Sequence, residues 1–151
     1  MNMKIFFALF SVLMICACAP VGVIQQPIFQ GLNVENSSKV CIARAPVYIG
    51  DGNRFDLTVD GWLFAKIYPA QYLCLQLPEG QHMIGVEGQS GIGINVIKTE
   101  SYFFKTNLSW VNFGVNFERL TEQQFEDLVQ TKDENNNMIY KNISTLKITS
   151  K

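Results

Sequence analysis

Histidine is nearly absent from this chain, since His82 is the only one among its 151 residues. A Ser-His-Asp or Cys-His mechanism would have no other histidine as its base, and a zinc site with several histidine ligands is excluded. Charge is sparse and nearly balanced, with 12 basic and 13 acidic side chains, so no basic surplus is available for nucleic acid. The glycine-rich run at 88–93 lacks the following helix and the lysine of a phosphate-binding loop. No cofactor or metal is therefore predicted.

The N-terminus contains a short apolar run. The eleven residues from Ile5 to Ile15 carry no charge, but a membrane-spanning helix needs roughly 20. Ala17 and Cys18 then follow, a pattern that resembles the lipobox of bacterial lipoproteins. The resemblance implies lipidation of the Cys18 sulfur, cleavage after Ala17 and acylation of the new amine. Cys16 competes as the acceptor but follows a bulky residue. An ordinary secretory signal and an uncleaved anchor are the alternatives.

Processing at Cys18 would leave a membrane-anchored chain, since three acyl chains hold a protein essentially permanently. Ala19 stands where an aspartate retains many lipoproteins at the inner membrane, so the same resemblance implies the outer membrane, facing the periplasm or the cell surface. Lys4 is the only charge lost with the signal, which leaves 11 basic and 13 acidic side chains and a net charge of −2. The lipid itself must then hold the membrane, because no basic excess is left to bind anionic headgroups.

The chain divides into four parts. Residues 1–17 form the signal, and residues 18–38 form the lipidated cysteine and a flexible tether, where proline, glycine and polar residues interrupt any periodicity. Residues 39–130 form the folded domain. Residues 131–151 form a polar tail with weak strand character at Ile139 to Tyr140 and at Leu146 to Ile148, and this tail is not expected in the core.

The folded part carries the period-two alternation of short strands. Asp60-Gly61 predicts a two-residue hairpin turn, because both positions of such a turn require positive φ. Pro78-Glu79-Gly80 predicts the turn before a further hairpin arm, and the glycines beyond it predict a loose loop or bulged strand. The spacing predicts a mostly β fold, an antiparallel sandwich of about seven strands, with a small barrel as the alternative. The segments with this pattern are 39–44, 55–59, 62–68, 73–77, 82–86, 94–98, 102–106 and 110–117.

A single short helix is predicted on the C-terminal side. Thr121 can cap it, with Gln124 three residues on as the partner in a capping box. Phe125, Leu128 and Val129 fall on one stripe, which should lie against the sheet.

Cys41 and Cys74 are the pair of cysteines left once Cys18 is acylated, in a compartment that permits disulfides. Both have the opposite parity to the apolar rows of their strands, so they could meet if those strands are neighbours. Strands in different sheets would hold their Cα atoms beyond the roughly 7 Å limit, so the disulfide stays open here.

The stretch from Lys39 to about Val129 resembles the small bacterial lipoproteins grouped as domain-of-unknown-function family 2846, whose PEGA-type repeats share the same turn. The resemblance implies an extracytoplasmic β-sandwich module without demonstrated activity. The matching segments are Val40 to Arg44, Val59-Asp60-Gly61, Tyr72 to Gly80 followed by His82, and the aromatic strand leading into Glu118-Arg119-Leu120.

His82 has the parity of Ile84 and Val86, which predicts a histidine at the mouth of the core, hydrogen-bonded to the Pro78-Glu79-Gly80 turn. The carboxylates lie at turns and strand edges, where charge is normally solvated, and no glycosidase-type pair stands out. Several aromatic residues share an outward parity and would suit a protein or glycan partner if they cluster. The alternative is that the helix, tether or tail covers them, or that they form cross-strand pairs. These residues are Trp62, Phe64, Tyr68, Tyr72 and Trp110.

Two functions fit this pattern. The first is a lipid-anchored, non-catalytic binding or structural module of the cell envelope. The second is a hydrolase of an envelope polymer with a site near His82, which would need at least two titratable groups within hydrogen-bond reach of one substrate atom. The single histidine favours the module.

Overall fold

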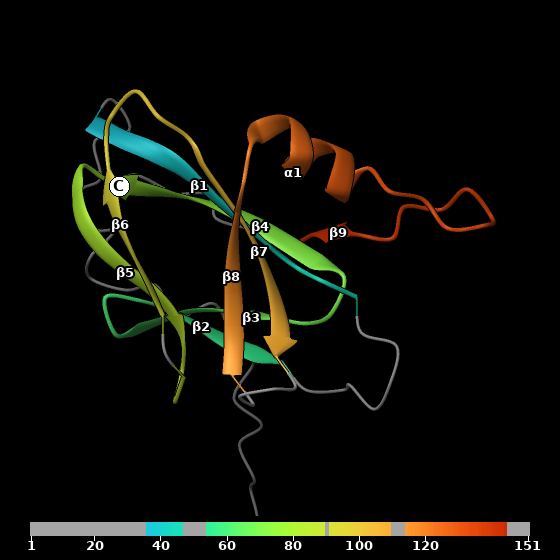
Figure 1. The fold of residues 1–151 in the computed structure, drawn as a ribbon, viewed down its shortest axis with the longest axis horizontal. Helices are drawn as coiled ribbons and strands as arrows, with labels where there is room; N and C mark the ends of the chain where they lie inside the picture. The colour runs from blue at the N-terminus through green and yellow to red at the C-terminus, as the bar shows by residue number, and fades with distance from the viewer. Residues whose placement is uncertain (1–35, 47–53, 90, 110–113, 145–151) are drawn as a thin grey trace, which may run out of the picture.

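The computed structural model describes residues 36–46, 54–89, 91–109 and 114–144. The signal, Cys18, Trp110, the stretch from Leu146 to Ile148 and nearly all of the tether lie outside these residues. The described chain forms two β-sheets and one helix (Figure 1). The strands are β1 Ser37–Arg44, β2 Phe55–Val59, β3 Trp62–Ile67, β4 Gln71–Pro78, β5 Gly80–Val86, β6 Ile92–Val96, β7 Tyr102–Ser109, β8 Gly114–Leu120 and β9 Lys141–Asn142, and the helix is α1 Glu122–Val129.

The mostly β fold with one short helix is confirmed. A five-stranded sheet has the order β8-β7-β1-β4-β9, and a four-stranded sheet has the order β3-β2-β5-β6. The pairing is mostly antiparallel, but β1 pairs with β7 and β4 pairs with β9 in parallel. The described residues contain nine strands instead of about seven, because all eight segments with the alternating pattern form strands and the tail adds β9.

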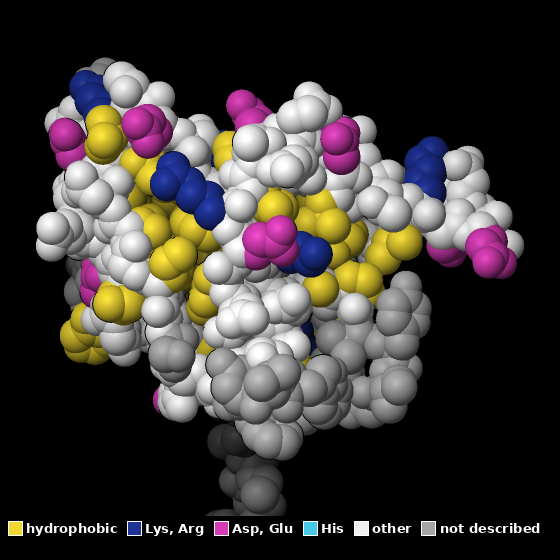
Figure 2. All heavy atoms as spheres, in the orientation of Figure 1, with side chains coloured by type: hydrophobic (Ala, Val, Ile, Leu, Met, Phe, Trp, Pro, Cys, Tyr) yellow, Lys and Arg dark blue, Asp and Glu magenta, His cyan; other side chains and the backbone are white. Residues whose placement is uncertain are grey.

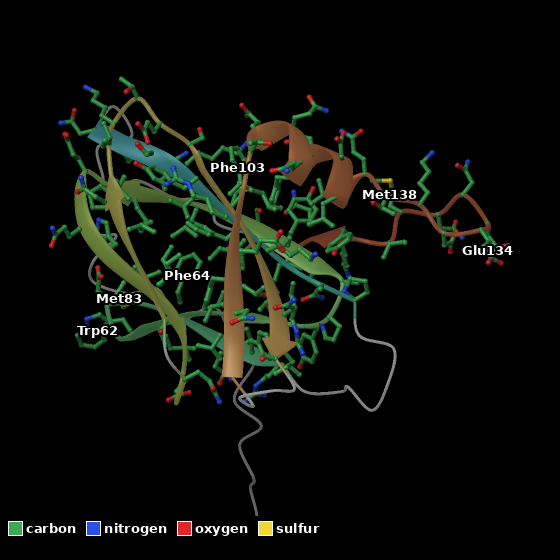
Figure 3. The ribbon with its side chains drawn as sticks, in the orientation of Figure 1. Trp62, Phe64, Met83, Phe103, Glu134 and Met138 are labelled. Atoms are coloured by element: carbon green, nitrogen blue, oxygen red, sulfur yellow. A yellow bond between two sulfur atoms is a disulfide. The ribbon has the colours of Figure 1, made fainter. Side chains whose placement is uncertain are left out.

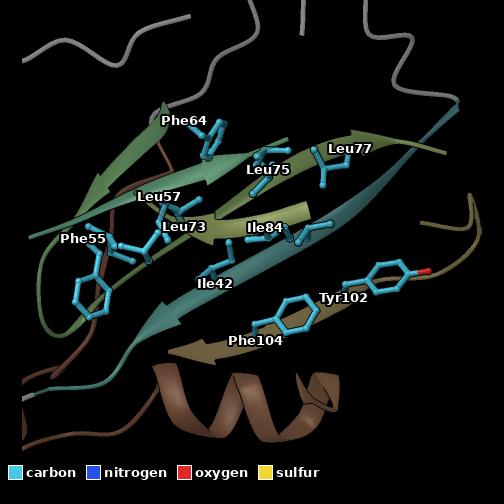
Figure 4. Packing of buried hydrophobic residues seen from close by; sticks show 14 of the residues in the cluster. Ile42, Phe55, Leu57, Phe64, Leu73, Leu75, Leu77, Ile84, Tyr102 and Phe104 are labelled. Carbon is cyan, nitrogen blue, oxygen red and sulfur yellow. The ribbon is translucent and has the colours of Figure 1, made fainter. Parts of the chain in front are cut away.

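The main core lies between the two sheets, where inward rows of both meet (Figure 4). The predicted alternation of β2 and β4 is confirmed, since Phe55, Leu57 and Val59 are buried with the leucines at 73, 75 and 77. Fully burying one such side chain is worth about 1.5 to 3 kcal/mol, so these rows fix which face of each strand points inward.

The β2–β3 hairpin turns at Asp60-Gly61, as predicted, with φ values of 51° and 80°. The register then shifts by one residue, because Leu57 pairs with Ala65 and Thr58 pairs with Leu63. Phe64 is the extra residue of this bulge and turns into the core. The expectation that Phe64 points outward with Trp62 is therefore wrong, since a bulge re-aims the side chains of the strand that carries it.

The Pro78-Glu79-Gly80 turn does not close a hairpin. β4 belongs to the five-stranded sheet and β5 to the four-stranded sheet, so the turn is a corner between sheets. Gly80 has φ 135°, a conformation that side chains rarely adopt, and it allows the chain to change sheet there.

A second cluster covers the outer face of the five-stranded sheet. The predicted capping box of α1 is confirmed, because Thr121 Oγ1 accepts a hydrogen bond from the Gln124 backbone N–H and the Gln124 side chain bonds the Thr121 N–H. Phe125 and Val129 of the helix pack on Cys41, Ala43 and Phe103. None of the helices in the described segments is long and apolar enough to cross a membrane.

The polar tail contributes to this cluster, contrary to expectation. Tyr140 is buried, and Lys141 and Asn142 pair with Gln71 and Tyr72 of β4. The Ile143 N–H also donates to the Tyr72 carbonyl at 2.8 Å. A short polar sequence gave no periodicity that would reveal this docking. At the other end of the domain, β1 begins at Ser37, two residues before the predicted strand.

Candidate functional site

His82 bridges two turns that are distant in sequence. Its Nδ1 lies 2.8 Å from Asp60 Oδ2, and its Nε2 lies 3.0 Å from the Pro78 carbonyl oxygen. The predicted bond to the 78–80 turn is confirmed, and the side chain is 9% exposed. The prediction missed the bond to Asp60, whose carboxylate was expected to be solvated.

Asp60 is held on β5 by three contacts. Its N–H donates to the Met83 carbonyl at 2.8 Å. Its Oδ1 accepts from the Met83 N–H at 2.8 Å, while Oδ2 faces His82. The left-handed backbone at Asp60, which aspartate tolerates, turns the carboxylate toward His82 and Met83 of β5, just beyond the last residue of β2 that pairs with this strand. The turn and the strand therefore form one rigid unit.

The ring of His82 faces an acceptor at each nitrogen. A carboxylate and a carbonyl oxygen both accept hydrogen bonds, so a ring nitrogen that carries a hydrogen donates to the oxygen it faces, and the tautomer decides which nitrogen does so. A nitrogen that donates in this way has no free lone pair with which to take a proton from a substrate. The arrangement clamps the β2–β3 turn to the corner between sheets, and a substrate would have to displace one of the two oxygens to reach a ring nitrogen.

The outward aromatic residues that the structure describes do not gather in one patch. Trp62 is 54% exposed and Tyr68 is 45% exposed, but they flank opposite ends of β3, roughly 20 Å apart along an extended strand. Tyr72 is half-buried against α1, with its ring centroid 5.9 Å from that of Phe125 in an edge-to-face contact. Cover by the helix, the alternative considered for these residues, therefore applies to Tyr72. Trp110 lies outside the described residues.

A hollow of about 500 Å³ lies beside the Asp60 turn, on the four-stranded sheet. Met83, which is 51% exposed, stands next to it. Sequence analysis missed this hollow, although a glycine inside a strand is a signal of close approach by a ligand or backbone. Its lining residues are Asp60, Gln81, His82, Met83, Gly93, Ile94 and Asn95.

Arg44 is a buried charge that the sequence did not reveal. The residue is 1% exposed, its Nη1 donates to the Ile67 carbonyl at 3.0 Å, and its guanidinium lies 3.6 Å from the centre of the Phe55 ring. These contacts join β1 of one sheet to β2 and β3 of the other, which is a structural role.

The described segments contain no group of three or more His, Cys, Asp or Glu side chains that could hold a metal ion. Figure 2 shows basic and acidic side chains scattered singly over the visible face, without a large patch of one sign.

Cys41 and Cys74, the pair that the sequence left open, are joined by a disulfide in the structure. The two residues lie directly opposite each other on β1 and β4. Their side chains point away from the main core, into the cluster beneath α1.

Comparisons with protein-family models, with curated proteins and with solved structures find no match to this chain. The resemblance in the sequence motifs therefore stays an expectation, and function has to be argued from the residues themselves.

Proposed function

We propose that the chain is a bacterial lipoprotein, anchored through Cys18 in the outer membrane, whose folded part is a non-catalytic binding or structural module of the cell envelope. The pattern Ala17-Cys18 after an apolar run supports the anchor. The disulfide between Cys41 and Cys74 supports a location outside the reducing cytoplasm. The domain would face the periplasm or the cell surface.

The observation that supports a non-catalytic role is that both ring nitrogens of His82 contact oxygen atoms of the fold. Both of its nitrogens are within 3.0 Å of oxygen acceptors that belong to the fold. The hydrolase alternative needs this residue as its acid or base, and it would have to break one of these bonds first. Binding a partner requires no such change.

The partner would be a protein or glycan of the envelope, held by the surface around the Asp60-Gly61 turn. Trp62 directly follows this turn, and Met83 of β5 is hydrogen-bonded to it, so two large exposed apolar side chains belong to residues beside the turn. Both are labelled in Figure 3, on the side of the molecule away from α1. Exposed aromatic groups of this kind are common anchors of interfaces.

The anchor is tested by replacing the acceptor cysteine in cells. Cys18→Ser should move the protein out of the membrane pellet, or leave it unprocessed, and abolish labelling by a fatty-acid analogue. Cys16→Ser is the matched control and should behave as wild type. If the two variants exchange these results, the wrong cysteine has been chosen.

The module is tested by crosslinking in intact cells followed by mass spectrometry of the captured partners. Trp62→Ala should weaken capture by about 2 kcal/mol or more if the ring anchors an interface. Tyr68→Ala, which removes an exposed ring at the far end of β3, is the control. His82→Gln should capture normally once its folded fraction is taken into account. If His82→Gln folds but loses all activity in the cell, while Trp62→Ala behaves as wild type, the result would favour the hydrolase.

A further inference from the structure

The outer face of the β5–β6 hairpin presents two amide side chains beside each other. Gln81 pairs directly with Asn95, and on the next outward row Met83 pairs with Gly93. Both amides are exposed, and neither side chain forms a hydrogen bond with any other described residue. Directly opposed residues have Cβ atoms about 4.5 to 5.5 Å apart, so the two amides can contact one small ligand together.

Gly93 is not a glycine that the fold requires. Its φ lies outside the left-handed range, and a Cβ added there would meet only the Met83 Cε, at 4.0 Å. Gly91 is the contrasting case, since a Cβ there would lie 2.4 Å from the Ile84 carbonyl oxygen. The fold therefore explains Gly91 but not Gly93. What the missing side chain at 93 does provide is open space between Met83 and the two amides, which is the hollow itself.

The described walls of the hollow carry little free charge. Its two titratable side chains, Asp60 and His82, are bonded to each other. Among the described residues that line it there is no lysine or arginine. An anionic ligand would find neither of these cations among them, and a cationic ligand would have to compete with His82 for the carboxylate. The remaining groups are amides, which both donate and accept hydrogen bonds, and the apolar side chain of Met83.

We propose that this hollow binds one unit of a neutral saccharide. The Gln81 and Asn95 amides bond neighbouring hydroxyls, while an apolar ring face lies over Gly93 and against Met83. This inference rests on the proposed binding function and names its ligand class. A peptide is the weaker fit, because extended peptides bind by adding a strand to a sheet edge. Such a strand would lie along the outer edge of β6, the last strand of its sheet, whereas the two amides and Met83 stand on the face of the hairpin.

The test is an NMR titration of the full chain in a detergent without a sugar headgroup. The probes are maltotriose and the trimer of N-acetylglucosamine, with trigalacturonic acid as the charged comparison. At least one neutral trimer should shift the side-chain amide signals of Gln81 and Asn95 and the backbone signal of Gly93, and the charged trimer should bind at least tenfold more weakly. Asn107 and Asn116, an exposed cross-strand amide pair on β7 and β8, should not respond, because their neighbouring row carries Ser109 opposite Gly114 and has no apolar side chain in the place of Met83.

The decisive variant is Gly93→Val, which fills the hollow with a residue that strands tolerate well. It should unfold at an unchanged or higher temperature and lose at least tenfold in affinity for the trimer, as should Asn95→Ala. Asn116→Ala is the matched control and should bind as wild type. The inference is overturned if Gly93→Val binds the trimer as well as wild type does. It is also overturned if neither neutral trimer shifts these signals at about 10 mM, a concentration at which even weak binding is detected, or if an extended peptide shifts them instead. Normal partner capture in cells by Gly93→Val would overturn the saccharide site while leaving the binding module in place.

Discussion

The two sheets differ in what lies on their outer faces. The five-stranded sheet is covered by α1 and by Tyr140, so most of β1 is buried on both sides. Nothing in the described part of the chain covers the four-stranded sheet over Gln81, Met83 and Gly93, and these residues stay at least partly open. One outer face therefore adds stability, and the other is free to recognise a ligand.

The difference is visible in the strands themselves. Both faces of β1 are apolar, with Val40 and Ile42 in the main core and Cys41 and Ala43 in the second cluster. β6 has isoleucines only on its inner face, with Gly93 and Asn95 on the other. A strand that is buried on both faces loses the clean alternation of a half-exposed one.

The largest effect should come from uncovering the five-stranded sheet. Phe125→Ala removes a ring that contacts Phe103 and Tyr72, with centroids 5.2 and 5.9 Å away. The free energy of unfolding should fall by about 3 to 5 kcal/mol. Urea denaturation measures this change. Met83→Ala on the open face is the control and should cost less than about 0.5 kcal/mol. Equal losses in the two variants would end the distinction between the faces.

The disulfide lies on the covered side as well. Cys41 and Cys74 are separated by 33 residues, and closing a loop of that length stabilises a chain by roughly 3 to 4 kcal/mol in the chain-entropy model. The double variant Cys41→Ala, Cys74→Ala should lose about this much in the same denaturation experiment. Reactive thiols at both positions in denatured, unreduced protein would instead show that the bond does not form.

His82 lies at the open side, where a smaller effect is expected. His82→Gln can keep one of its two hydrogen bonds, so the loss in unfolding free energy should be roughly 1 to 2 kcal/mol. Hydrogen exchange at the Met83 amide, which is bonded to Asp60, should accelerate at the same time. Unchanged stability would mean that the clamp between the turn and the corner contributes nothing.

The smallest effect concerns Asp133, on the hairpin that projects from the covered side (Figure 1). Hydrogen bonds from the Asn137 backbone N–H, the Asn137 side chain and the Asn135 backbone N–H hold the pKa of Asp133 below its ordinary value, although desolvation opposes them. Because the pKa is lower in the folded state, these hydrogen bonds stabilise the hairpin at pH values above the unfolded-state pKa of about 3.9. The stabilisation is lost as the pH falls through the folded-state pKa.

Because Asp133 is fully exposed, only the local hairpin should respond. The amide signals of Asn135 and Asn137 should move as the pH is lowered below the ordinary pKa of an aspartate side chain, and the Gly93 signal should not move. Asp133→Asn should abolish the movement. A shift of equal size across the sheets would show that the transition is not local.

Sequence alone was sufficient where neighbours a few residues apart decide the conformation. The Asp60-Gly61 turn, the Thr121 cap and the alternation in β2 and β4 all depend on contacts within one turn or one strand. The bulge at Phe64 was missed, because it depends on pairing with another strand and has no signature of its own in an apolar run.

By itself the sequence determined a mostly β domain with one capped helix behind an apolar N-terminus, since backbone preference and hydrophobic period are local properties. Tertiary structure alone decided that β4 and β5 lie in different sheets, that Cys41 faces Cys74, and that His82 bonds a carboxylate 22 residues away. It also decided which outer face is covered. These outcomes depend on which strands become neighbours, and period-two alternation fixes the faces of a strand without fixing its partner.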